Sequence, residues 1–213
     1  PEMDNKQFTH VRYEGEFEGT LYATAENILD VPHTAFLHKG LFRGGKPNEI
    51  ETETRRFQHF SECEYIGEPR PSGLMGAILA PGGGMVEHTD RFLLPGIAQV
   101  EYRLGNYQLM TTSALTPVGA HRTKMYAVVS VRFGWVAPLL RPFVTPVALT
   151  VVRQDVRMLK SMMQNTVRFG GEAYVNTEVD VLSSSILRLL KRASRTALPV
   201  SYERGQPLSV QRS

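Results

Sequence analysis

Two histidines lie five residues apart in an otherwise largely apolar stretch near the N-terminus, where their side chains could bind a metal ion. His33 and His38 are accompanied by two polar residues, Asn27 and Asp30. On an unbroken helix the two imidazoles would point about 140° apart, because each residue turns the helix by about 100°. Pro32 has no amide N–H and crowds the carbonyl four residues earlier, so it can end or bend the helix. The two rings can then converge on one ion.

These residue types point to metal chemistry. Neutral imidazole binds iron, zinc, copper and nickel. Two histidines and one carboxylate that leave other positions open are typical of non-haem Fe(II) that must bind O₂. The spacing alone also permits one exposed histidine and one that is hydrogen-bonded in the core. The choice between these interpretations depends on where a carboxylate could come from.

Asp155 is the candidate carboxylate, because it lies on the apolar face of a helix that we predict over residues 145–169. Gly170-Gly171 ends this helix. An unpaired buried carboxylate is unfavourable, so Asp155 must meet a cation, hydrogen-bond donors or a metal ion. The pattern leaves a salt bridge and a metal site open, and Asp180 and Asp90 are rival carboxylates. The same face carries Val151, Val152, Met158, Leu159, Met162, Met163 and Val167.

The string of residues around the histidines resembles the iron-binding segment of a known enzyme family. Asn-x-x-Asp-x-x-His-x-x-x-x-His, preceded by Glu26 and followed by Gly40-Leu41-Phe42, is similar to that segment in the catalytic domain of Rieske non-haem iron aromatic-ring oxygenases. The vanillate O-demethylase-like group is the subgroup that it resembles. The specific part of the resemblance covers residues 26–42 and Asp155. Many members have Glu-Asp where this chain has Gln154-Asp155.

The resemblance implies a role for each matching residue. His33, His38 and Asp155 would bind one mononuclear Fe(II). Asp30 would be the bridge that passes electrons to the iron site, and Asn27 would be a neighbour of the iron. O₂ and a small apolar or aromatic substrate would meet at the open face of the iron. The implied reaction is hydroxylation or oxidative dealkylation of that substrate.

The resemblance also implies redox partners outside this chain. A Rieske [2Fe–2S] cluster needs two cysteines and two histidines, and Cys63 is the only cysteine. We therefore expect residues 1–213 to form a single catalytic domain, with the cluster on a removed N-terminal domain or on another polypeptide. The family further implies a reductase or ferredoxin as electron donor. It also implies a homotrimer in which electrons arrive from the neighbouring subunit.

The elements that must position these residues follow an α+β pattern. An extended segment over residues 8–17 precedes a helix over about 20–31. Between residues 49 and 133, strands separated by short turns favour an antiparallel meander with one face against the core. The expected strands are 50–60, 61–66, 86–94, 97–104, 107–116 and 122–133, with turns at 95–96, 105–106 and 117–119 and loops at 40–47 and 73–84.

Two helices complete the predicted domain. The long helix over 145–169 is followed by a second over about 181–193, and the tail from Pro199 is expected to be loose. The resemblance implies a helix-grip (START/Bet v 1-like) fold, in which an antiparallel sheet wraps around a long C-terminal helix and leaves a cavity. Met158 and Met162 could line this cavity or simply fill the core.

The charge and the apolar pattern of the chain argue against nucleic-acid and membrane partners. The net charge of +3 is mild, and Lys and Arg are spread along the chain, so we expect no nucleic-acid partner. The apolar run 133–152 is interrupted by Arg141 and three prolines, whereas a membrane span needs about 20 apolar residues. We expect buried chain there rather than a membrane-surface segment. A lone cysteine and the lack of a signal-peptide pattern are consistent with a reducing cytoplasm.

Two other functions remain open on the sequence. A helix-grip domain could bind a hydrophobic ligand without catalysis and carry its histidines only by ancestry. A zinc hydrolase could use the same ligands, with Glu26 as a candidate general base. Tight iron binding would argue against a domain that only binds a hydrophobic ligand.

Overall fold

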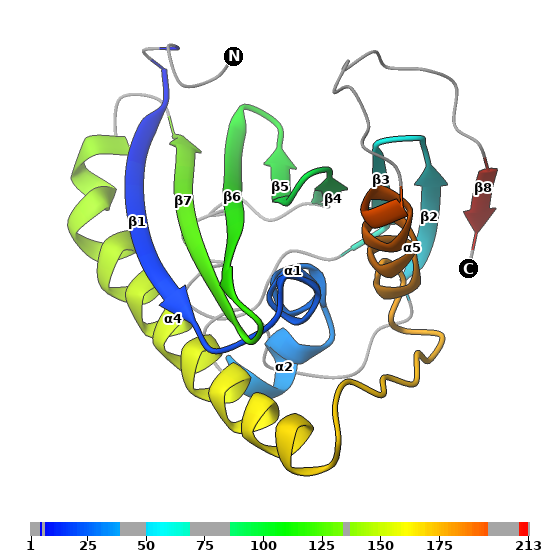
Figure 1. Ribbon diagram of the computed structural model, residues 1–213. Coiled ribbons are helices and arrows are strands. Elements are labelled where there is room, and N and C mark those ends of the chain that lie inside the picture. Colours follow the sequence, from blue (N-terminus) through cyan, green and yellow to red (C-terminus); the bar gives the residue numbers. More distant parts are fainter. Residues whose placement is uncertain are drawn as a thin grey trace.

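The computed structural model describes residues 5, 7–38, 50–68, 86–133, 137–195 and 209–212, and Figure 1 labels their elements. The order of strands and helices agrees with the expected α+β pattern. The predicted loops at 40–47 and 73–84 lie outside the described residues. The elements are β1 (Thr9–Phe17), α1 (Leu21–Leu29), α2 (His33–Leu37), β2 (Glu51–Arg56), β3 (Phe60–Ile66), β4 (Glu87–Leu93), β5 (Ile97–Leu104), β6 (Tyr107–Gly119), β7 (Arg122–Arg132), α4 (Ala137–Arg168), α5 (Ser183–Arg195) and β8 (Ser209–Arg212).

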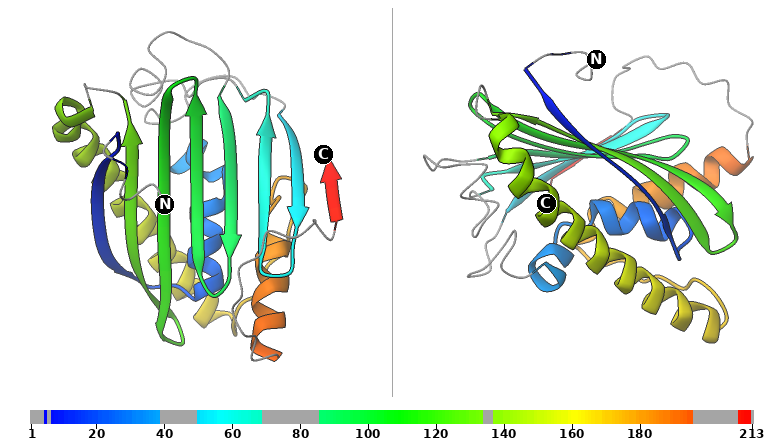
Figure 2. Two further views of the ribbon diagram at one scale, coloured as in Figure 1. Left: turned by 90° about the horizontal axis from the view of Figure 1, so that it is seen from above. Right: turned by 90° about the vertical axis from the view of Figure 1, so that its left-hand side faces the viewer.

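One antiparallel sheet contains the described strands, in the order β1-β7-β6-β5-β4-β3-β2-β8. Strands β2 to β7 follow one another as a meander. Strand β1 returns to pair with β7, from Thr9 opposite Val131 to Phe17 opposite Thr123. Figure 2 shows that the sheet is curved and that the helices lie on one of its faces. The core is therefore the layer between that face and the helices.

Side chains of the sheet alternate between an inner, mostly apolar face and a charged outer face, as the strand period of two requires. On the inner face Phe92 and Ala98, which are opposite each other on β4 and β5, have no exposed surface. On the outer face Arg91 forms ion pairs with Glu62 at 3.1 Å and with Glu101 at 2.8 Å. Opposite charges on neighbouring strands contribute about 0.2–1 kcal/mol per pair.

Helix α1 is the element on which the rest of the core packs. It contacts the sheet as well as α4 and α5. The Thr20 hydroxyl caps it by accepting a hydrogen bond from the Ala23 amide at 3.1 Å. Ala25 of α1 has no exposed surface, and neither do Ile186 and Leu189 of α5. This packing fixes the C-terminal end of α1, from which the histidine segment continues.

Helix α4 is longer than predicted. It starts at Ala137 rather than near residue 145 and continues through Pro142 and Pro146. A proline removes one helical N–H and crowds the preceding turn. A proline can bend a helix without ending it. Because the prediction placed the start of the helix near residue 145, among these prolines, it set the start too late. The predicted end at Gly170-Gly171 is confirmed, because their φ angles of 96° and 121° leave the helical region.

Three strand predictions also differ from the structure. The strand expected over 50–60 ends at Arg56, and Phe60 already belongs to β3. Strand β6 extends to Gly119 through the expected turn, and a register shift between Pro117 and Gly119 absorbs the irregularity. The tail that was expected to be loose ends in β8, which pairs with β2 from Arg56 opposite Ser209 onward. An edge strand offers unpaired backbone groups, and β8 satisfies those of β2.

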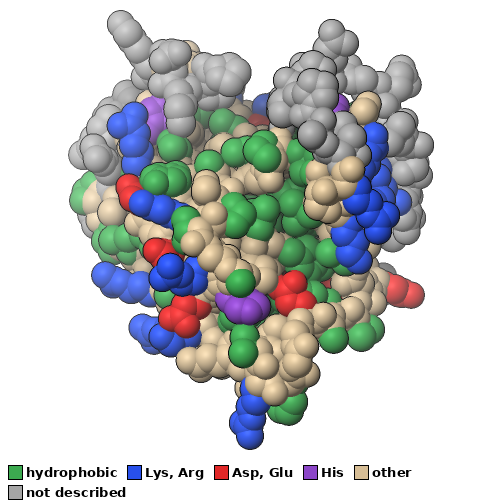
Figure 3. Space-filling view, viewed as in Figure 1, with side chains coloured by type: hydrophobic (Ala, Val, Ile, Leu, Met, Phe, Trp, Pro, Cys, Tyr) green, Lys and Arg blue, Asp and Glu red, His purple; other side chains and the backbone are tan. Residues whose placement is uncertain are grey.

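The face shown in Figure 3 carries charges of both signs next to one another over β1 and the adjoining part of α4. Ion pairs join Lys124 to Glu14 at 2.7 Å and Lys160 to Glu18 at 2.7 Å. Exposed pairs of this kind contribute only about 0–1 kcal/mol, so the core is the main source of stability. Within the described ranges, none of the helices combines the length and the apolar character that crossing a membrane requires.

A buried ionic cluster interrupts the apolar inner face of the sheet. His88 of β4 lies between Glu68, 2.6 Å from its Nδ1, and Asp90, 2.9 Å from its Nε2. Its ring stacks between those of Tyr65 and Tyr102, with centroids 4.3 and 4.1 Å away. Burial alone would lower the pKa of His88, but Asp90 and Glu68 outweigh burial and raise the pKa to about 9. The fold therefore stabilises the imidazolium form.

The free energy of unfolding should fall as the pH rises from about 6.5 to about 9. Because the folded-state pKa of His88 exceeds its ordinary value of 6.5, the stabilisation is complete below pH 6.5 and is lost as His88 deprotonates. The expected loss is roughly 3 kcal/mol. Urea unfolding at a series of pH values measures it. His88→Gln should remove the contribution of His88 and leave a much shallower slope, whereas His121→Gln, in the exposed β6–β7 turn, should keep the full slope; equal slopes would contradict the assignment.

Candidate metal centre

The chain interrupts its first helix just before the two histidines. Helix α1 ends at Leu29, and Asp30 is extended, with φ −84° and ψ 101°. Pro32 then occupies the N-cap position of the short helix α2, which starts at His33 and ends immediately before His38. The predicted interruption exists, but it lies ahead of both histidines, and α2 itself was not predicted. The end of α2 lets the second imidazole turn back toward the first.

The two histidines and Asp155 of α4 converge. The two Nε2 atoms of His33 and His38 are 3.3 Å apart. Asp155 Oδ1 lies 3.2 Å from His38 Nε2 and 3.6 Å from His33 Nε2. Of the His, Cys, Asp and Glu side chains in the described ranges, these three form the one group spaced to hold a metal ion.

The triangle of ligand atoms has the size of one face of a metal site. Ligand atoms about 2.1 Å from a metal ion lie about 3.0 Å apart at right angles and about 3.4 Å apart at tetrahedral angles. The observed separations of 3.2, 3.3 and 3.6 Å are close to these values. Asp155 Oδ1 is buried and accepts no well-oriented hydrogen bond. The residues present therefore fit a metal ion.

Two carbonyl oxygens orient the imidazoles for this task. The Nδ1 of His33 donates to the backbone oxygen of Asp30, and the Nδ1 of His38 donates to Gln154 Oε1 at 2.7 Å. A carbonyl oxygen can only accept, so each Nδ1 carries the proton and each Nε2 keeps its lone pair. The sequence analysis gave Gln154 no contact with His38, although its position next to Asp155 indicated that it lies near the site.

Electrostatics favour an ionised carboxylate in this group. Burial alone would raise the pKa of Asp155, but the adjacent His33 and His38 outweigh burial and lower it. Burial would lower the pKa of His33, but Asp155 and then Asp30 outweigh burial and raise it. A bound metal ion would take the place of the proton on His33 as the positive partner of the Asp155 carboxylate, because ligands bind metals in their deprotonated forms.

The other residues of the histidine segment lie around the group. Asp30 Oδ2 is 3.6 Å from His33 Nδ1, and burial raises the pKa of Asp30 although His33 partly offsets this. Asn27 lines the same cavity as the three converging residues. Glu26 accepts a hydrogen bond from Ser183 Oγ at 3.1 Å. Glu26 is thus directed toward α5, which does not favour it as the general base of a zinc hydrolase.

The converging residues form one end of a cavity of about 370 Å³, a volume suited to a small organic molecule. The inner face of the sheet forms the opposite wall, and α4 closes the cavity with apolar residues. Met158 and Met162 do not line it. Met158 is 50% exposed, and Met162 packs against the core. The α4 residues that line it are Thr145, Val147, Ala148, Leu149, Val151, Val152 and Asp155.

The rival carboxylates have other partners. Asp180 accepts hydrogen bonds from the backbone amide and the hydroxyl of Thr177, at 2.5 and 2.9 Å. Asp90 is bound to His88. Neither belongs to the converging group.

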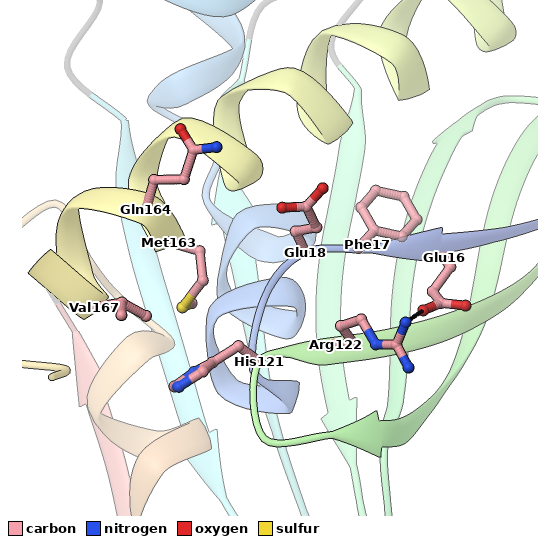
Figure 4. A pocket seen from close by; sticks show the side chains of 8 residues that line it. All are labelled: Glu16, Phe17, Glu18, His121, Arg122, Met163, Gln164 and Val167. Carbon is pink, nitrogen blue, oxygen red and sulfur yellow. Dashed lines mark ion pairs between the residues drawn. The ribbon is translucent and has the colours of Figure 1, made fainter.

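A second hollow, of about 600 Å³, lies between the β6–β7 turn, the end of β1 and the C-terminal half of α4. Figure 4 shows Met163, Gln164 and Val167 of α4 on one side and the ion pair of Arg122 with Glu16 on the other. The hollow is open, and none of the converging residues lines it. The smaller cavity is therefore the candidate functional site.

Solved structures share this fold. Dicamba monooxygenase bound to 3,6 dichlorosalicylic acid has a TM-score of 0.76 at 14% identity, over 90% of this chain and 60% of that chain. NdmA of Pseudomonas putida CBB5 with caffeine has a TM-score of 0.66 at 18% identity, over 91% and 54% of the two chains. For NdmB of the same organism the values are 0.64, 16%, 91% and 52%. The expected helix-grip fold is thereby confirmed, and the chain spans between 52% and 60% of these relatives.

Sequence comparison gives the family. No curated protein shows significant similarity to the chain. A family model described as the vanillate O-demethylase oxygenase C-terminal domain matches residues 18–196. This range includes the two histidines, Asp155 and most of the described helices and strands. The chain belongs to the vanillate O-demethylase oxygenase C-terminal domain family.

Proposed function

We propose that this chain is the catalytic domain of a Rieske-type oxygenase and that His33, His38 and Asp155 hold its mononuclear Fe(II). The observation that carries the proposal is the convergence of the three ligand atoms around a buried carboxylate oxygen without a hydrogen bond. Membership of the family supports it. Two imidazoles and one carboxylate are also the ligand set suited to a ferrous ion that must keep positions open for O₂.

The reaction that fits this site is oxygen insertion into an apolar organic molecule. A ferrous ion with open positions supplies O₂ binding and activation. Overall, one C–H bond, O₂, two electrons and two protons give one C–OH group and water. Insertion into a ring gives hydroxylation, and insertion into an O-methyl or N-methyl group leads to dealkylation. The chain itself contributes the 370 Å³ cavity, which holds the substrate beside the ligand face and limits access of water.

Electron delivery is assigned to Asp30, with Asn27 as a neighbour of the iron. Asp30 contacts His33 through its carboxylate and through its backbone oxygen. A Rieske [2Fe–2S] cluster on another domain or chain, fed by a reductase or ferredoxin, would supply the electrons, and in a homotrimer they would come from a neighbouring subunit. We also propose a cytoplasmic location, because the one cysteine, Cys63, is a buried thiol.

Removal of Asp155 tests the metal centre. The wild-type chain should bind about one Fe(II) under anaerobic conditions, and Asp155→Ala should retain almost none after desalting, because only two of the three ligands remain. Asp180→Ala is the matched control and should bind iron like the wild type, since Asp180 lies outside the group. Metal content and circular dichroism measure binding and folding. A folded wild-type chain that holds no iron would overturn the oxygenase proposal and favour a domain that only binds a hydrophobic ligand.

Gln154 should control iron affinity through His38. Gln154→Ala should weaken Fe(II) binding by about ten- to a hundred-fold, because loss of the partner at Nδ1 releases the ring from its productive orientation. Gln154→Glu keeps an acceptor there and should restore binding. Gln164→Ala, on the exposed side of the same helix, is the control. Equal affinities for the Ala and Glu variants would show that the hydrogen bond has no such role.

Asp30→Asn tests electron delivery in the complete oxygenase with its electron donor. Asparagine keeps the size of the side chain and leaves the backbone acceptor of His33 in place, so iron should stay bound. Turnover should fall by about ten-fold or more, because the carboxylate beside His33 is lost. Iron content and substrate-dependent O₂ consumption measure the two effects, with Glu178→Gln as an exposed control. Normal turnover by the variant rejects the bridging role.

A further inference from the structure

The sheet side of the cavity carries one carboxylate oxygen without a hydrogen bond. Asp90 of β4 lines the same cavity as the candidate metal centre, and it is 1% exposed. Its Oδ1 accepts a hydrogen bond from His88 Nε2 at 2.9 Å. Its Oδ2 is buried and has no hydrogen-bond partner among the described residues. Buried polar atoms are satisfied in the great majority of cases, so this oxygen requires a donor.

The immediate neighbours of Asp90 do not supply that donor. Cys63 and Val100 lie opposite it on the two adjacent strands. Valine has no polar side-chain atom, and the Cys63 thiol, a weak donor, contacts a backbone oxygen 3.9 Å away. His88 has no further proton to give, because its other ring nitrogen, Nδ1, lies 2.6 Å from Glu68 Oε2. The position of Tyr65 therefore decides whether Asp90 is satisfied from within the sheet.

The hydroxyl of Tyr65 lies near Asp90 but does not satisfy it. Burial, and then the neighbouring Asp90, raise the pKa of Tyr65, so its hydroxyl keeps its proton. The hydroxyl and Asp90 Oδ2 are nevertheless both without a well-oriented hydrogen bond. The ring of Tyr65 is stacked on that of His88, with centroids 4.3 Å apart, and this stacking holds the hydroxyl in place. Asp90 Oδ2 is therefore left for a donor that enters the cavity.

Asp90 differs from the other polar groups on this wall in the ligand that it selects. Tyr13, Tyr102, Thr111 and Ser113 line the cavity with hydroxyl groups, and a hydroxyl can either donate or accept. An ionised carboxylate oxygen can only accept. Hydrogen bonds to a charged acceptor are also the stronger kind. Asp90 therefore distinguishes a ligand that brings a donor from one that brings only an acceptor.

We propose that Asp90 is a substrate-binding residue whose Oδ2 accepts a hydrogen bond from a neutral O–H or N–H group of the substrate. The substrate class is then an apolar, ring-sized molecule with such a donor, for example a phenol or an N–H heterocycle. The proposal rests on the proposed function, because it takes this cavity as the substrate site of the oxygenase. The hydrogen bond fixes the donor end at the sheet and leaves the rest of the molecule to face the three converging residues. A ligand that displaces water from Oδ2 without supplying a donor loses affinity.

Indole and benzofuran test the preference for a donor. Both are neutral bicyclic molecules of nearly the same shape, and they differ in having a ring N–H or a ring oxygen. Calorimetry with the iron-free, chelator-treated chain should give a dissociation constant at least about ten-fold lower for indole, because benzofuran cannot donate to the charged acceptor. In an NMR titration, the N–H proton of ¹⁵N-labelled indole should move downfield on binding, because a carboxylate acceptor deshields it.

Substitution of Asp90 assigns the preference to this residue. Asp90→Val removes the acceptor and keeps a side chain of similar size that suits a strand. It should lower the preference for indole by about ten-fold and abolish the downfield shift. Thr89→Val is the matched control, because Thr89 is the adjacent residue of β4 and lies on the outer face. The control should keep both effects, and so should Tyr65→Phe, which removes only the nearby hydroxyl.

Equal wild-type affinities for the two probes would overturn the proposal, and so would a folded Asp90→Val variant that keeps the preference. Loss of the preference in a folded Tyr65→Phe variant would assign the contact to the tyrosine and overturn it too. Thermal unfolding establishes which variants are folded. If Asp90→Val does not fold, the indole proton shift in the wild type and in Tyr65→Phe decides, and an unshifted proton rejects the contact.

Failure of both probes to bind would also overturn the proposal, since the cavity would then admit no ring-sized ligand. The assay needs no iron, so its outcome is separate from that of the iron titration. Donor selection in a chain that holds no iron would overturn the oxygenase proposal alone, and iron binding without donor selection would overturn this one alone.

Discussion

The rest of the structure depends on one constraint: three atoms with lone pairs must be held close together in a largely buried position. His33 Nε2, His38 Nε2 and Asp155 Oδ1 lie 3.2–3.6 Å apart. Lone pairs directed at one another are unfavourable in a region of low dielectric until a cation is bound. The surrounding chain must therefore hold them in position. Helix α1 and the short α2 hold the histidines from one side, and α4, packed along β1, carries the carboxylate to them from the other.

The close packing of α1 and β6 against the β4–β5 turn depends on a single glycine. A side chain at Gly96, in the turn between β4 and β5, would place its Cβ 2.7 Å from the backbone oxygen of Leu115 and 3.3 Å from Leu21 of α1. Leu115 also donates its amide to Gly96 oxygen at 2.8 Å. The turn can approach β6 and α1 only because this residue has no Cβ. Any displacement here would move α1, and with it the start of the segment that carries the histidines.

The sequence predicted the parts of the site that depend on local spacing. His38 belongs to a short recognisable string, and Asp155 stands out as a carboxylate in an apolar stripe of helical period. The contact of Gln154 with His38 could not be predicted, because it depends on how α4 is rotated against a segment 116 residues away. The setting of His88 depends in the same way on strand register, which places two tyrosines opposite it. Met158 was misplaced because it lies at the margin of the stripe, where packing decides exposure.

Acidic groups lie at both ends of the cavity. Asp30 and Asp155 line the end with the proposed metal centre, and Asp90 lines the sheet side, where it pairs with His88. Apolar side chains line the space between, so charges at either end reach a bound molecule with little screening. Gln154 belongs to this arrangement. A carboxylate in its place would also accept a hydrogen bond from His38 Nδ1 but would add a third acidic group beside the metal centre, whereas the neutral amide orients the imidazole without adding charge.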